Sequence, residues 1–159
     1  MLETDLVHLR RCVELAREAL EAGDEPFGSV LVGADGTALA EDRNRVNTGA
    51  DPTLHPEFTL ARWAAESLPT KDRPGATVYT SGEHCAMCSA AHAWVGLGRI
   101  VYASSSAQLG SWLAELGVAP GPVAPLPVSA VAPGVVVEGP APGLDEEVRA
   151  LHRRLHDRG

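Results

Sequence analysis

Residues 76–103 read ATVYTSGEHCAMCSAAHAWVGLGRIVYA, and this stretch decides the fold class. Residues 76–80 and 99–103 are short runs rich in β-branched and aromatic side chains, which is typical of strands. Residues 85–95, which lie between them, are mostly small or helix-favouring and predict a helix. A strand–helix–strand unit of this kind is the building block of α/β proteins, so we expect a sheet covered by helices.

Outside this stretch, the apolar side chains of residues 4–21 recur at steps of three and four and predict an amphipathic helix. Residues 27–32 and 37–41 predict two strands joined by a turn at Asp35-Gly36. The remaining expected elements are helices at about 56–68, 107–116 and 144–156 and one strand at 135–137. Strands alternate with helices along the whole chain, so helices are expected on both faces of the sheet.

The length of 159 residues predicts a single domain, residues 1–159. Within it we expect a core at about residues 4–117 and a C-terminal helix at about residues 144–156. The intervening residues 119–143 hold seven of the twelve prolines and are expected to be extended and mostly loop.

The composition excludes several function classes. At 45% apolar and 21% charged residues the chain is typical of a globular protein, and it contains no apolar run of 18 residues, so no membrane partner is expected. The N-terminal residues lack the pattern of an export signal, which favours the cytoplasm. The net charge of −8 argues against nucleic acid as the main partner.

Two short motifs carry the chemistry, His55-Pro56-Glu57 and the pair Cys85 and Cys88. Histidine and cysteine are ligands that zinc prefers, and a Cys-x-x-Cys pair at a helix start lets two thiolates hold one ion. Three protein ligands leave one tetrahedral position for water, which is the arrangement of a catalytic zinc site. Glu57 lies two residues beyond the candidate ligand His55, where it can approach that water without binding the metal.

A His-x-Glu motif followed by Cys-x-x-Cys resembles the zinc-dependent cytidine/deoxycytidylate deaminase superfamily, and the chain is nearest its guanine and cytosine (nucleobase) branch. The resemblance covers about residues 4–103. Further matching positions are Pro26-Phe27-Gly28, Asn44, Asp51-Pro52-Thr53, Tyr79-Thr80-Ser81 and Trp94.

This resemblance implies a three-layer α/β/α sandwich around a mixed five-stranded sheet, and a homodimer. It implies one Zn²⁺ per chain, held by His55, Cys85 and Cys88, with Glu57 moving protons between water, the base and the departing ammonia. The residues expected to contact the substrate are Asn44, Pro56, Phe27, Trp94, Glu83 and His84.

Each of these residues also has a purely structural interpretation. The cysteine pair is compatible with a redox motif or with a closed structural zinc site, for which Cys12 is the spare fourth ligand. The apolar side of the first predicted helix accounts for Cys12 by packing. Asn44 fits a turn cap, and Phe27 and Trp94 fit a core.

The sequence departs from the family pattern at three places. Pro56 replaces a residue whose backbone N–H typically donates to a carbonyl of the base. His84 replaces the usual proline before the first cysteine and faces either the pocket or solvent, while Glu83 either contacts ring N–H groups or is exposed. No Phe, Tyr or Trp follows Trp112 to close the pocket, and the C-terminal helix offers His152 and His156 instead.

The predicted function is therefore zinc-dependent hydrolytic deamination of a small aminopurine or aminopyrimidine base, with modified or analogue bases included. The enzymatic alternatives are deamination of nucleosides or nucleotides, for which Arg43 and Arg45 are the candidate phosphate ligands, and deamination of adenosine in tRNA. A different class of alternative is a non-catalytic zinc-binding module on the same fold.

Overall fold

The computed structural model describes residues 1–157 and contains a mixed five-stranded sheet with the strand order β2-β1-β3-β4-β5. The strands are β1 (Gly28–Val32), β2 (Ala38–Arg43), β3 (Thr77–Gly82), β4 (Ile100–Ser104) and β5 (Val137–Glu138). β1 is antiparallel to both β2 and β3, whereas β3, β4 and β5 run parallel.

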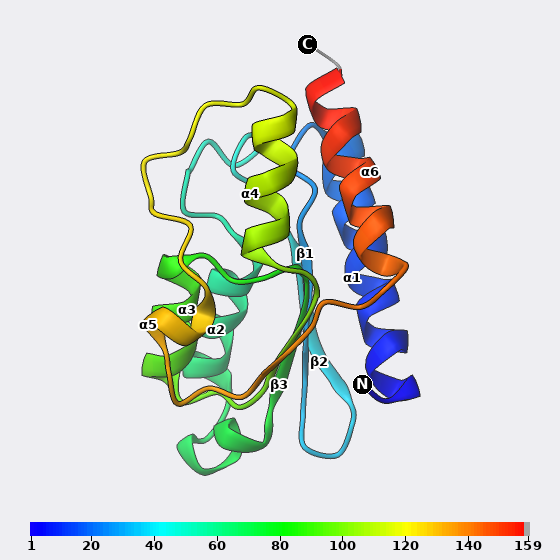
Figure 1. The fold of residues 1–159 in the computed structure, drawn as a ribbon. Helices are drawn as coiled ribbons and strands as arrows, with labels where there is room; N and C mark the ends of the chain where they lie inside the picture. Colours follow the sequence, from blue (N-terminus) through cyan, green and yellow to red (C-terminus); the bar gives the residue numbers. More distant parts are fainter. Residues whose placement is uncertain (158–159) are drawn as a thin grey trace.

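Helices cover both faces of this sheet, as Figure 1 shows. The helices are α1 (Glu3–Ala22), α2 (Pro56–Ser67), α3 (Ala86–Val95), α4 (Ser106–Glu115), α5 (Val128–Val131) and α6 (Leu144–Asp157), with a 3₁₀ helix at Thr70–Gly75. α1 and α6 lie side by side on one face, and α2 and α3 pack together on the other (Figure 1). The predicted three-layer α/β/α sandwich is confirmed.

The alternation of side chains along β1 explains the two cores. Val30 and Val32 pack with α1 and α6, whereas Leu31 between them packs with α2 and the end of α3. All five residues of β1 are buried, as expected for a strand covered on both faces. Cys12 is fully buried in the α1 core, so packing accounts for it.

The elements lie within a few residues of their expected positions, with two differences in the proline-rich segment. The last strand is Val137–Glu138 rather than residues 135–137, and it pairs with Ile100 and Val101. The segment also contains the short helix α5, whose Val128 packs on Ile100. Within residues 1–157, no helix combines the length and apolar character needed to cross a bilayer.

His152 of α6 occupies a position in the core between α1, α4 and the sheet. Its ring meets Phe27 edge-on at a centroid distance of 5.0 Å and lies 6.3 Å from the ring of Trp112. Burial lowers the pKa of His152 to about 4. The side chain is therefore neutral in the folded protein at neutral pH.

This burial predicts a loss of stability in mild acid. Between pH 6.5 and 4 the unfolded chain binds a proton at His152 that the folded chain does not, so stability falls as the pH falls through this window. From pH 7.5 to 5 the expected loss at this one residue is about 2 kcal/mol. Urea denaturation of His152→Leu at both pH values is expected to show a correspondingly smaller loss. An identical pH dependence in the wild type and in His152→Leu would contradict the prediction.

Candidate active site

The two sequence motifs meet at the starts of two neighbouring helices. His55 is the N-cap residue of α2 and Cys85 is the N-cap residue of α3, and Cys88 lies one turn into α3. His55 Nδ1 lies 3.5 Å from Cys85 Sγ and 3.7 Å from Cys88 Sγ. All three candidate ligand atoms lie within 4.8 Å of one another.

These distances fit a tetrahedral zinc ion. Zn–N and Zn–S bonds of about 2.1 and 2.3 Å at a tetrahedral angle place nitrogen and sulfur about 3.6 Å apart. The cluster contains no fourth His, Cys, Asp or Glu within residues 1–157, and Cys12 lies in the α1 core. The donor set of one imidazole and two sulfurs therefore matches an open zinc site.

The electrostatic environment favours the thiolate of Cys85, whereas it raises the pKa values of His55 and Cys88 and so favours their protonated forms. The hydrogen bond from Cys88 lowers the pKa of Cys85 to about 4, so Cys85 is a thiolate at neutral pH. The positive end of the α3 helix acts in the same direction. The hydrogen bond with the Cys85 sulfur raises the pKa of His55.

Glu57, the second residue of α2, is buried beside this cluster. The hydroxyls of Ser29 on β1 and Thr80 on β3 each donate to its Oε1 atom over 3.0 Å. Glu57 also lines the pocket described below. Burial raises the pKa of Glu57 above its ordinary value. Two strands thus hold this carboxylate in one orientation at the candidate zinc site.

The site opens into a cavity of about 230 Å³. Of the predicted site residues, His55, Pro56, Glu57, Cys85, Asn44, Phe27 and Glu83 line it. This volume is below the ~300–1,000 Å³ of pockets for drug-sized ligands, so the cavity suits a molecule of one or two rings.

Asn44 lies at the end of β2 with its side chain almost fully buried. Its Oδ1 atom accepts a hydrogen bond from the backbone N–H of Val46, so the carbonyl half of the amide is occupied. In the described part of the chain nothing accepts a hydrogen bond from its Nδ2 atom. Asn44 therefore both caps a turn and presents a donor to the pocket.

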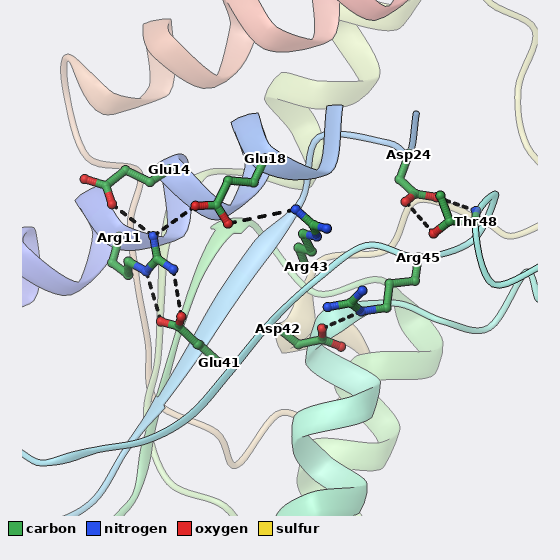
Figure 2. Close-up of polar contacts among 9 residues, drawn as sticks. All are labelled: Arg11, Glu14, Glu18, Asp24, Glu41, Asp42, Arg43, Arg45 and Thr48. Atoms are coloured by element: carbon green, nitrogen blue, oxygen red, sulfur yellow. Dashed lines mark hydrogen bonds and ion pairs between the residues drawn. The ribbon is translucent and has the colours of Figure 1, made fainter. Parts of the chain in front are cut away.

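A buried carboxylate, Asp24, holds the loop that follows Asn44. Its oxygens accept hydrogen bonds from the backbone N–H and the hydroxyl of Thr48 at 2.9 and 2.7 Å (Figure 2). The backbone N–H of Asn47 also donates to Asp24, over 2.9 Å. Burial alone would raise the pKa of Asp24, but these hydrogen bonds outweigh it and lower the pKa. The loop is thus tied to the end of α1.

Three of the predicted substrate contacts differ in the structure. His84 and Trp94 do not line the cavity, and Glu83 lines it but is already hydrogen-bonded. His84 is fully buried, does not line the cavity, and packs against His92 at a centroid distance of 5.4 Å. Neighbouring side chains in extended backbone point to opposite sides; since Glu83 and Cys85 face the pocket, His84 faces away. Glu83 does line the pocket, but both of its oxygens already accept backbone hydrogen bonds.

Trp94 is the second correction. It lies six residues after Cys88 on α3, and a helix returns to the same face after three, four or seven residues, so Trp94 points elsewhere. Its side chain is 89% exposed and borders a separate surface groove with Leu97 and Val135.

Sequence reasoning missed the outer wall of the cavity. Leu109, Gly110 and Leu113 of α4 and residues 123–126 of the proline-rich segment form it, together with Glu25 and Ser106. His152, expected as a substitute for a closing aromatic residue, lies behind Phe27 and does not line the cavity. A proline-rich loop has no periodic pattern, so no signal in the sequence marks it as a pocket wall.

The two arginines beside Asn44 also lie outside the cavity. Arg43 extends toward Glu18 of α1 at 4.0 Å, and Arg45 pairs with Asp42 at 3.0 Å (Figure 2). The cavity lining contains three glutamates and neither lysine nor arginine. Both arginines are therefore engaged in ion pairs outside the cavity.

Comparison with known families agrees with this geometry. Residues 2–104 match the model of the cytidine and deoxycytidylate deaminase zinc-binding region. The chain belongs to this deaminase family. Its members bind zinc, and the cluster of His55, Cys85 and Cys88 is the corresponding candidate site here.

Relatives in the family act on different substrates. A probable cytosine deaminase from Schizosaccharomyces pombe is 34% identical over 67% of this chain and 64% of its own length. A tRNA-specific adenosine deaminase from Agrobacterium fabrum is 36% identical over 60% of this chain and 62% of its own. The matched part therefore spans less than two thirds of these curated relatives. The solved structure of guanine deaminase from Bacillus subtilis superimposes with a TM-score of 0.59 at 32% identity, covering 80% of this chain and 83% of that one.

Proposed function

We propose that this protein is a zinc-dependent deaminase of a small free nucleobase, an aminopurine or aminopyrimidine, which it hydrolyses to the oxo base and ammonia. The observation that carries the proposal is the carboxylate of Glu57, buried beside the His55, Cys85 and Cys88 cluster at the base of a small cavity. Family membership supports the reaction type.

In this proposal His55, Cys85 and Cys88 hold the ion. Zinc bound there supplies a Lewis acid that lowers the pKa of water and so provides the nucleophile near neutral pH. Glu57 takes a proton from the water that adds to the amino-bearing ring carbon and delivers it to the adjacent ring nitrogen. Glu57 then transfers the hydroxyl proton of the tetrahedral adduct to the amino group. The C–N bond breaks, and ammonia leaves as the carbonyl forms.

The cavity favours a free base over a nucleotide or tRNA. Three glutamates and neither lysine nor arginine line it, so the cavity offers no lysine or arginine side chain to bind a phosphate group. Its size suits one or two rings, and the side chains of α4 and residues 123–126 supply apolar surface for the faces of a planar ring. Asn44 is proposed to donate from Nδ2 to an acceptor on the base.

The test is ammonia release by metal-replete protein from a panel of bases, the matching nucleosides and nucleotides, a tRNA anticodon stem, and aminotriazines. Activity on one or more free bases, with kcat/KM at least tenfold above that for the nucleosides, is expected. Preference for a nucleotide or for a tRNA anticodon stem would refute the proposed substrate class. Bound zinc without activity on any of these would indicate a non-catalytic zinc module.

Pro56 provides a specific prediction within this function. It is the first residue of α2, where a backbone N–H has no intrahelical partner, and it lines the cavity. Alanine at this position would supply a donor to a carbonyl of the base, and one added hydrogen bond is expected to lower KM about tenfold with little change in kcat. Steady-state kinetics of Pro56→Ala on a base with a ring carbonyl checks this; an unchanged KM would mean that no acceptor lies there.

We also propose that the protein forms a homodimer. The exposed Trp94 borders an apolar groove with Leu97, Val131, Pro133 and Val135. Groups of apolar residues of this kind on a protein surface are typical of interaction sites. For the wild type, light scattering after size-exclusion chromatography is expected to give twice the mass of one chain. For Trp94→Glu it is expected to give the mass of a single chain.

A further inference from the structure

Glu83 links three elements around the pocket. It follows β3 and stands two residues before Cys85. Its Oε1 atom accepts a hydrogen bond from the backbone N–H of Ser106 over 2.9 Å, and its Oε2 atom accepts one from Val128 over 2.8 Å. Ser106 is the first residue of α4 and Val128 the first of α5, where backbone N–H groups lack intrahelical acceptors. One carboxylate thus joins the starts of both helices to the metal-site loop.

The chain between these two anchors contributes much of the outer wall of the cavity. Four residues of α4 and residues 123–126 line it. Residues 119–127 form no helix or strand, and among the described residues their backbone N–H groups make no hydrogen bond to another element. Val123 and Leu126 line the cavity although they are 58% and 42% exposed. The hydrogen bond from Val128 to Glu83 is therefore the first backbone N–H hydrogen bond to another element after residues 119–127.

We propose that Glu83 is a positioning residue that holds the wall of residues 106–128 against the metal-site loop and thereby sets the affinity for the base. This inference rests on the proposed deaminase function. Each carboxylate oxygen is held by the backbone N–H of a helix start, so in this proposal Glu83 acts through the wall rather than by contact with the base. A wall that contacts the ring face binds the substrate and the transition state alike, so its displacement is expected to change KM more than kcat.

Glu83→Gln provides the first test because the amide nitrogen is a donor and cannot accept from a backbone N–H. One of the two anchors is therefore lost. KM for the best base is expected to rise about tenfold, with kcat changed less than about twofold. Glu83→Asp keeps the charge but is one methylene shorter, and it is expected to give a smaller rise. Glu115→Gln, an exposed change on α4, is the control.

Hydrogen exchange measured by mass spectrometry gives a readout independent of activity. Peptides containing Ser106 and Val128 are expected to exchange about tenfold faster in Glu83→Gln than in the wild type, with unchanged zinc content. Unchanged exchange would overturn the proposal, as would a fall in kcat at constant KM, which indicates contact with the reacting base. Faster exchange in a protein that releases ammonia from no base would refute the proposed function while supporting the holding role of Glu83.

Discussion

Glu57→Gln is expected to lower kcat for deamination of the best base by about 10³-fold, within the ~10²–10⁴-fold range for general acid–base catalysis. The amide is the same size as the carboxylate, and its oxygen can still accept from Ser29 and Thr80, so the fold around it should be retained. What is lost is the basic oxygen that takes the proton of water and returns it to the substrate. The measurement is ammonia release at saturating substrate, together with zinc content by atomic absorption.

The control for this variant is Glu66→Gln on the exposed side of the same helix. It removes the same charge and should keep wild-type kcat. Full activity in Glu57→Gln would assign proton transfer to another group. Loss of activity accompanied by loss of zinc would instead mean that Glu57 supports the metal site.

The second large effect concerns the metal. Cys88→Ser replaces a thiolate ligand with a hydroxyl that remains protonated near neutral pH, so zinc affinity is expected to fall more than about 100-fold. Loss of a residue that only orients a ligand already costs about 10–100-fold, and loss of the ligand should cost more. The activity of Cys88→Ser should fall with its zinc content. In the wild type, chelation should remove the activity and added zinc should restore it. Competition with a chromophoric chelator measures the affinity.

Cys12→Ala is the matched control for this prediction because Cys12 is the one other cysteine and lies in the α1 core. It should keep the zinc affinity of the wild type, with a small loss of stability from the missing sulfur. Wild-type zinc affinity in Cys88→Ser would exclude Cys88 from the ligand set. The site would then have to be completed by another group.

Much of the fold and the metal cluster could be predicted because the signals are local. Steps of three and four in α1, and the apolar run of β1 before the Asp35-Gly36 turn, depend only on neighbouring residues, and the structure places both elements within two residues of expectation. The spacing of Cys85 and Cys88 around a helix start likewise gives two sulfurs on one side of α3. The zinc-ligand chemistry of histidine suggested His55 as their partner, and the resemblance to the deaminase family supported that assignment.

The sequence by itself therefore determined the order of the elements, the ligand types and the family. Tertiary structure alone decided that His84 points into the core, that Trp94 points to the surface and that Glu83 binds two helix starts. It also placed residues 123–126 over the cavity. The physical reason is that the direction of a side chain and the path of an aperiodic loop depend on contacts between segments far apart in the chain, and no local pattern records those contacts.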